Sequence, residues 1–154
     1  MGGKMLLNIL VPILIIAFIF ILAGCFMFVM RRNKKEIIDR IKCVGDYSDN
    51  VLTIDNERYF VQLVKVGSND DFSINSMNVM QVRYKTGSKL INIAKTELKK
   101  IILVYPFNGK LKRYINENEM EFITYKNFFW GMHVCKLSEL SEFVKYLRGK
   151  HESI

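Results

Sequence analysis

The longest apolar stretch of the chain covers residues 6–30. Only Asn8, Pro12 and Gly24 fall outside the apolar set there, and no residue in it is charged. A helix of this length would extend about 37 Å at roughly 1.5 Å per residue, which exceeds the hydrocarbon core of a bilayer at about 30 Å. Because a helix on a soluble core is apolar on one face only, this pattern predicts a transmembrane helix over 6–30.

Basic residues gather on one side of this stretch. Arg31, Arg32, Lys34 and Lys35 follow it, whereas only Lys4 precedes it. The end richer in lysine and arginine normally stays in the cytoplasm, where each basic group adds about 1 kcal/mol of attraction to an anionic leaflet. The four residues are therefore predicted to lie at the membrane interface. The predicted organisation is an extracytoplasmic N-terminus, a transmembrane helix, a basic juxtamembrane segment and a cytoplasmic domain, at residues 1–5, 6–30, 31–44 and 45–154.

The residues Leu-Ala-Gly-Cys at 22–25 resemble the lipobox of bacterial lipoproteins, in which the chain is cleaved before the cysteine and lipidated there. This alternative predicts an exported lipoprotein attached through Cys25. Against it, residues 26–30 stay apolar beyond the cleavage point, and the basic run then follows as it does after a stop-transfer segment. The intact anchor is the favoured interpretation, and the lipoprotein is its alternative.

After residue 50 the pattern changes to the alternation of β-strands. Strands are predicted over 51–54, 58–66 and 78–84, with a hairpin turn at Asp55-Asn56-Glu57 between the first two. The loop GSNDD over 67–71 separates the second strand from the third.

The apolar residues of 90–98 have helical spacing and predict a helix. Residues 101–106 form a short apolar run typical of a buried strand, and Asn108-Gly109 after it matches a two-residue hairpin turn. Two further strands are predicted over 120–125 and 128–135.

The chain ends in a predicted amphipathic helix. Ser138 can cap its start and Gly149 can end it, with acidic residues in the first turn and basic residues in the last. Its buried stripe has the spacing of one helix face and consists of Leu140, Phe143, Val144 and Leu147. The fold class predicted for the whole chain is α+β, a single N-terminal transmembrane helix followed by a small mixed α/β domain.

Charge and composition narrow the class of protein. The formal charge is +8, and five of the basic residues lie at position 4 and within 31–35, which leaves +3 on residues 36–154. So small an excess disfavours nucleic acid as a partner. Two prolines and nine glycines are too few for a disordered or collagen-like chain, and three cysteines are too few for a disulfide scaffold.

The sequence holds no complete set of catalytic or metal-ligating residues. His133 lies in an apolar strand and is interpreted as structural, whereas His151 lies near the end of the chain. Cys43 and Cys135 have no metal-ligand spacing, and there is no Gly-x-Ser-x-Gly sequence. No cofactor and no metal are predicted. The aromatic run at 128–130 is interpreted as core on one side of its strand.

Residues 69–87, NDDFSINSMNVMQVRYKTG, resemble the restriction-endonuclease-like (PD-(D/E)XK) fold, in the variant of modification-dependent restriction enzymes. The resemblance implies that Asp71 and Gln81 hold a magnesium ion on one sheet face and that Arg83 replaces the usual lysine. Because arginine scarcely loses its proton, the resemblance implies a degenerate, inactive member. If the resemblance is set aside, Gln81 and Arg83 are interpreted as the solvent-facing residues of a strand with alternating polarity.

Two other arrangements compete with this one. In a second register Asp55 precedes Leu63-Val64-Lys65, where leucine stands in place of the acid. The order of short strands followed by one helix also resembles a pleckstrin-homology-type β-sandwich, provided that 90–94 is a strand.

The leading functional hypothesis is a single-pass membrane-anchored protein whose cytoplasmic domain is a non-catalytic binding module. Its predicted partners are the lipid bilayer and an unidentified protein. The alternatives are a metal-dependent nuclease that uses Asp71 and Gln81, and an exported lipoprotein lipidated at Cys25.

Overall fold

The computed structural model describes residues 2–116 and 118–151, and the side chains of residues 14–28, 34–116 and 118–150. The chain forms two compact units, residues 1–39 and residues 40–154. The fold and the site described below belong to the second unit.

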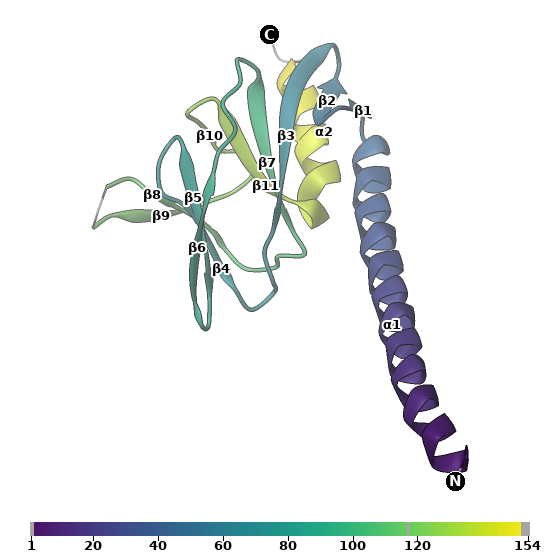
Figure 1. Cartoon of the computed structure of the whole chain (residues 1–154). Helices are drawn as coiled ribbons and strands as arrows, with labels where there is room; N and C mark the ends of the chain where they lie inside the picture. Colours follow the sequence, from purple (N-terminus) through teal and green to yellow (C-terminus); the bar gives the residue numbers. More distant parts are fainter. Residues whose placement is uncertain (1, 117, 152–154) are drawn as a thin grey trace. The chain divides into compact units, whose positions relative to one another are not determined.

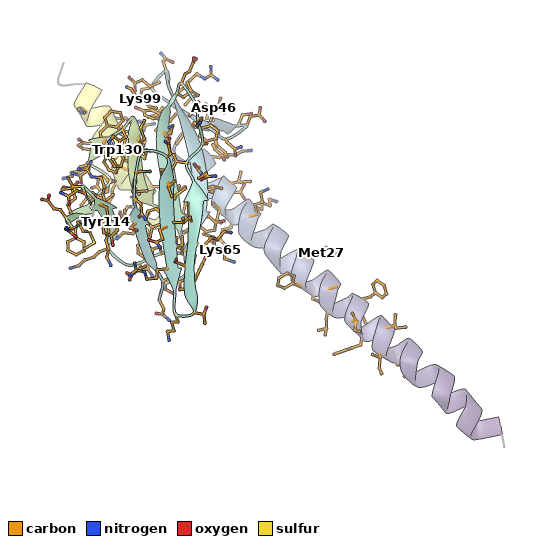
Figure 2. All side chains as sticks on the ribbon, turned by 60° about the vertical axis from the view of Figure 1, so that its left-hand side comes forward. Met27, Asp46, Lys65, Lys99, Tyr114 and Trp130 are labelled. Atoms are coloured by element: carbon orange, nitrogen blue, oxygen red, sulfur yellow. The ribbon has the colours of Figure 1, made fainter. Side chains whose placement is uncertain are left out.

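The first unit consists of most of helix α1, Gly2–Lys42. Its described side chains over 14–28 are exposed, among them Met27 (Figure 2). Within the described residues, no helix is both long enough and apolar enough to cross a membrane. The predicted single-pass transmembrane helix over 6–30 is therefore corrected. Residues 6–13, 29 and 30 of the predicted segment lie outside the residues whose side chains are described.

The basic juxtamembrane residues divide between described and undescribed side chains. Lys34 and Lys35 are exposed on α1, whereas Arg31 and Arg32 lie outside the residues whose side chains are described. The predicted orientation, with 1–5 outside the cell and the domain in the cytoplasm, is not tested by these residues and stays a prediction.

The second unit contains two mixed β-sheets (Figure 1). The six-stranded sheet A has the order β1 (Asp46–Ser48), β2 (Val51–Ile54), β3 (Glu57–Lys65), β7 (Lys99–Tyr105), β11 (Met132–Lys136) and β10 (Phe128–Phe129). The five-stranded sheet B has the order β6 (Gly87–Asn92), β5 (Val79–Tyr84), β4 (Asp71–Ile74), β8 (Leu111–Tyr114) and β9 (Met120–Ile123). Parallel pairs join β3 to β7, β7 to β11 and β4 to β8, and the other pairs are antiparallel.

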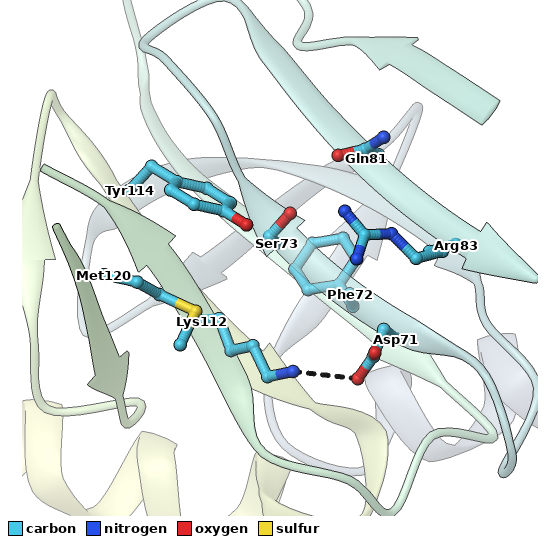
Figure 3. A pocket seen from close by; sticks show the side chains of 8 residues that line it. All are labelled: Asp71, Phe72, Ser73, Gln81, Arg83, Lys112, Tyr114 and Met120. Carbon is cyan, nitrogen blue, oxygen red and sulfur yellow. Dashed lines mark hydrogen bonds and ion pairs between the residues drawn. The ribbon is translucent and has the colours of Figure 1, made fainter. Parts of the chain in front are cut away.

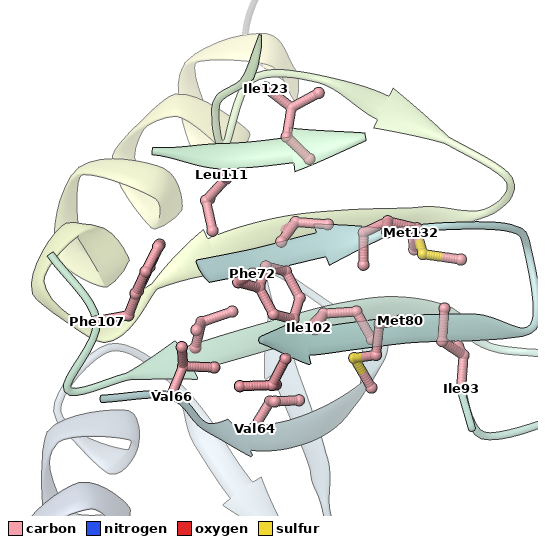
Figure 4. Close-up of a cluster of buried hydrophobic side chains, with 14 of the residues drawn as sticks. Val64, Val66, Phe72, Met80, Ile93, Ile102, Phe107, Leu111, Ile123 and Met132 are labelled. Atoms are coloured by element: carbon pink, nitrogen blue, oxygen red, sulfur yellow. The ribbon is translucent and has the colours of Figure 1, made fainter. Parts of the chain in front are cut away.

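The hydrophobic core lies between the two sheets (Figure 4). Because side chains alternate along a strand, Phe72 and Ile74 of β4 point toward sheet A while Asp71 and Ser73 point away from it. From sheet A, Ile102 and Val104 enter the same core. The predicted buried strand over 101–106 is confirmed as β7, which pairs with a parallel strand on each side.

Helix α2 (Leu140–His151) follows the short 3-10 helix η1 (Leu137–Glu139) and packs on the other face of sheet A (Figure 1). The predicted stripe is confirmed, since all four of its residues, Leu140, Phe143, Val144 and Leu147, are buried. The predicted start and end of this helix are wrong. Ser138 lies inside η1, and Gly149 lies inside α2.

The turn between β2 and β3 is confirmed. Asp55 and Asn56 have φ angles of 48° and 68°, and Ile54 pairs directly with Glu57. Two consecutive positive φ angles characterise a type I′ turn, for which aspartate and asparagine are suited because their short polar side chains tolerate that region.

Three predicted elements of the domain are wrong. Residues 90–98 are not a helix, because Leu90 and Ile91 pair with β5 in strand β6 and Ala94 is held by the side chain of Gln62. Asn108-Gly109 does not close a hairpin, because the strands on its two sides belong to different sheets. The predicted strand over 128–135 is broken into β10 and β11 by a turn at Trp130-Gly131.

The predicted fold class as a whole is therefore corrected. In the described residues the structure has helices α1, η1 and α2, none of them apolar enough to cross a membrane, and a mixed α/β domain in which the strands form two mixed sheets. The physical reason is the long-range pairing of β4 with β8, which draws five strands into a second sheet.

Candidate functional site

The outer face of sheet B is the surface of sheet B turned away from the core. No helix of the second unit lies on it within the described residues, since α2 packs on sheet A (Figure 1). Leu90 and Phe122 are 64% and 58% exposed there. Because apolar side chains on a sheet are normally covered, this uncovered face is the candidate functional site.

The strand register brings the sequence-predicted residues together on this face. Asp71 pairs with Arg83 and Ser73 pairs with Gln81 across β4 and β5. Residues that lie opposite each other on neighbouring strands point to the same side of the sheet. Asp71, Gln81 and Arg83 therefore share one small surface depression (Figure 3).

The depression includes residues that sequence reasoning missed. Lys112 and Tyr114 reach it from β8, and Met120 reaches it from β9 (Figure 3). Their only signal in the sequence is the alternation of KLKRYI, which puts Lys112 and Tyr114 on one face of a strand. Which residues they meet depends on the parallel pairing of Ser73 with Lys112.

The depression contains one carboxylate, and that carboxylate is paired. Lys112 Nζ donates to Asp71 Oδ1 at 2.9 Å. Ser73 Oγ donates to Asn75 Oδ1 at 2.8 Å, and Asn75 Nδ2 donates to Gln81 Oε1 at 3.2 Å. The oxygen of the Gln81 amide is thus occupied, and its nitrogen is the group left to contact a ligand.

This arrangement differs from a magnesium site. Within the described residues, no group of three histidine, cysteine or acidic side chains is placed to hold a metal ion. Arg83 and Lys112 bring two positive charges to the one negative charge of Asp71. A hard divalent cation prefers several oxygen ligands, whereas this depression offers mainly hydrogen-bond donors and a net positive charge. Its chemistry suits an anion.

The second nuclease-like register does not form a site. Asp55 lies in the turn before β3, where its carboxylate pairs with Arg148 at 3.5 Å. Lys65 lies at the far end of that strand, which extends roughly 26 Å from Glu57 to Lys65 at about 3.3 Å per residue.

The aromatic run at 128–130 is divided between core and surface. Phe129 is buried, whereas Phe128 and Trp130 are 49% and 41% exposed (Figure 2). The guanidinium of Arg113 lies 4.4 Å from the ring centre of Phe129 and 5.4 Å from that of Trp130, and it also pairs with Glu121 at 2.5 Å. The Nε of this guanidinium is buried and has no hydrogen-bond partner within the described residues. Because its other contacts are with Glu121 and the two rings, the cluster is assigned a packing role.

His133 is a structural residue. It is 5% exposed, and its ring lies between those of Phe128 and Phe143 at centre distances of 4.8 and 5.0 Å. Its Nδ1 lies 3.1 Å from the carbonyl oxygen of Tyr125, so an Nδ1–H would donate there. Burial lowers the pKa of His133 below its ordinary value, because the charged ring loses its hydration.

A pH dependence of stability follows from this pKa. Below about pH 6.5 the unfolded chain binds a proton at residue 133 more readily than the folded chain. The free energy of unfolding should therefore fall as the pH drops from about 6.5 toward the folded-state pKa, by at most about 1.4 kcal/mol per pH unit. Denaturant unfolding between pH 8 and pH 5 measures this slope. His133→Gln should reduce this slope, and equal slopes for the parent chain and the variant would contradict the assignment.

The three cysteines differ in exposure. Cys135 is buried, and burial raises the pKa of its thiol, so it is a poor nucleophile. Cys25 and Cys43 are exposed. Lipidation at Cys25 is not tested by this geometry and stays a prediction.

Comparison of the chain with models of protein families, with curated proteins and with solved structures finds no match. The resemblance to restriction-endonuclease-like proteins therefore stays a prediction.

Proposed function

We propose that the second unit, residues 40–154, is a non-catalytic binding module that contacts a protein partner through the outer face of sheet B. The observation that carries this proposal is the composition of that face. It joins exposed apolar side chains, Leu90 and Phe122, to the cationic groups of Arg83 and Lys112 around a small depression. Exposed apolar area beside charged groups is a common property of protein interaction surfaces.

The alternative function is the metal-dependent nuclease. The observation that favours it is the shared depression of Asp71, Gln81 and Arg83, because a nuclease of the predicted type needs them on one face. Against it, the ion pair with Lys112 neutralises Asp71, and no second acid lines the depression. The binding module is therefore the better supported function.

Site-specific photo-crosslinking tests the binding module. Benzoylphenylalanine placed at Leu90 of the full chain is expected to give an adduct of one discrete size in cells that express it. The same label at Lys145, an exposed position on α2, should give none. Charge reversal by Arg83→Glu should remove the adduct at Leu90. Equal adducts at both positions, or none at Leu90, would contradict the proposal.

A nuclease assay tests the alternative. The full chain incubated with single- and double-stranded DNA and RNA in the presence of Mg²⁺ is expected to leave the strands intact. Magnesium-dependent cleavage that is lost in Asp71→Asn would contradict a purely binding function and assign the depression to catalysis.

A further inference from the structure

One row of side chains crosses the whole outer face of sheet B. The strand pairings place Leu90 beside Gln81, Gln81 beside Ser73, Ser73 beside Lys112, and Lys112 beside Phe122. Neighbouring strands are about 4.8 Å apart, so the row extends roughly 19 Å from Leu90 to Phe122. It has an exposed apolar residue at each end and polar groups in its middle.

The depression beside the middle of the row is rich in hydrogen-bond donors. Arg83 has no carboxylate partner within the described residues, and its guanidinium lies over the depression beside Gln81 (Figure 3). The hydroxyl of Tyr114 points into the same depression from the other side (Figure 3). A carboxylate accepts hydrogen bonds at both oxygens and pairs well with a guanidinium, so it fits these donors.

The apolar ends of the row are accessible. Leu90 lies on β6 and Phe122 on β9, the two edge strands of sheet B. Lys110 Nζ lies 4.9 Å from the ring centre of Phe122, so one end is itself flanked by a positive charge. A ligand that contacts both ends must be about as long as the row, which excludes a small carboxylic acid.

We propose that the outer face of sheet B binds an extended acidic segment of a partner protein, with an aspartate or glutamate at Arg83 and an apolar residue on each side. This rests on the proposed binding function. An extended chain advances about 3.3 Å per residue, so the two apolar residues lie about six positions apart. Arg83 belongs to β5, the strand beside that of Leu90, so the acid lies between the two apolar residues and nearer to the one at Leu90. A carboxylate is preferred to a phosphate because Lys112 and Asp71 neutralise each other, which leaves the single positive charge of Arg83 to balance a single negative charge.

Selection from a library of random seven-residue peptides tests this segment. The full chain is immobilised, and the affinity of the enriched peptides is then measured by fluorescence polarisation. Enriched peptides are expected to carry an acid between two apolar residues. Arg83→Glu should weaken their binding about tenfold or more, since a charge-assisted hydrogen bond becomes a repulsion. Arg58→Glu, the same change at an exposed position of sheet A, should alter it less than about twofold.

The outcomes separate this inference from the proposed function. Enriched peptides without an acid between two apolar residues, or binding that Arg83→Glu leaves unchanged, would overturn the acidic segment but not the binding module. No enrichment would also overturn the acidic segment, and together with no adduct at Leu90 it would overturn both. A change in the oligomeric mass of the full chain caused by Arg83→Glu would assign the face to a second copy instead. These comparisons require that each variant is folded, which is shown by an unfolding temperature equal to that of the parent chain.

Discussion

Phe72→Ala is expected to lower the free energy of unfolding of the second unit by about 3–5 kcal/mol. Phe72 lies on β4 in the core between the sheets, is 0% exposed, and has its ring centre 6.5 Å from that of Phe107. Loss of the ring removes its burial and leaves a cavity that the two paired sheets fill only in part. Urea unfolding followed by the fluorescence of Trp130, the single tryptophan of the chain, measures the change.

The matched control for Phe72 lies on the same sheet. Phe122→Ala removes an identical side chain from the outer face, where it is 58% exposed, and should change the stability by less than about 0.5 kcal/mol. Equal losses in the two variants would show that the core does not lie between the sheets.

Phe143→Ala is expected to have an effect of similar size, about 3–5 kcal/mol, by detaching α2 from sheet A. Phe143 is 0% exposed, and its ring contacts those of His133 and Tyr125 at centre distances of 5.0 and 6.2 Å. Thermal or urea unfolding again measures the loss. Lys145→Ala, an exposed position on the same helix, should be nearly neutral.

A second readout ties this prediction to His133. Without the Phe143 ring, water reaches the imidazole and the lowered pKa should return toward its ordinary value. Titration of the imidazole C2 proton by NMR measures that pKa in folded samples of the parent chain and of Phe143→Ala. An unchanged pKa would mean that burial under α2 is not the cause of the lowered value.

Local signals in the sequence predicted the local elements correctly. The alternation of 51–54 and 58–66 and the turn at Asp55-Asn56 agree with the β2–β3 hairpin, because a type I′ turn needs only suitable residues at two positions. The buried stripe of the C-terminal helix was also visible, since the spacing of Leu140 and Phe143 places them on one helix face.

Elements whose conformation depends on distant partners were predicted incorrectly. The spacing of 90–98 favours a helix, yet its first residues pair with β5, and Gln62 donates to the carbonyl of Asn92 and accepts from the N–H of Ala94. Trp130-Gly131 is a turn although tryptophan is unusual at a positive φ, here 49°. The pairing of Phe129 with Met132 imposes that turn, and no local pattern indicated it.

The candidate site shows the same distinction between what local patterns predict and what distant partners impose. Alternation along a strand is a local property, so the sequence already indicates that Gln81 and Arg83 share one face of a strand that follows Asp71. The neighbours of these residues come from the fold, because β8 lies beside β4, where Lys112 neutralises Asp71 and Tyr114 adds a donor. The parallel pairing of β4 with β8, about 40 positions apart, is set by the burial of both sheets in one core, and no short stretch of sequence indicates it. The same pairing brings Lys112 to Asp71, so that a set of residues resembling a metal site becomes a face suited to an anion.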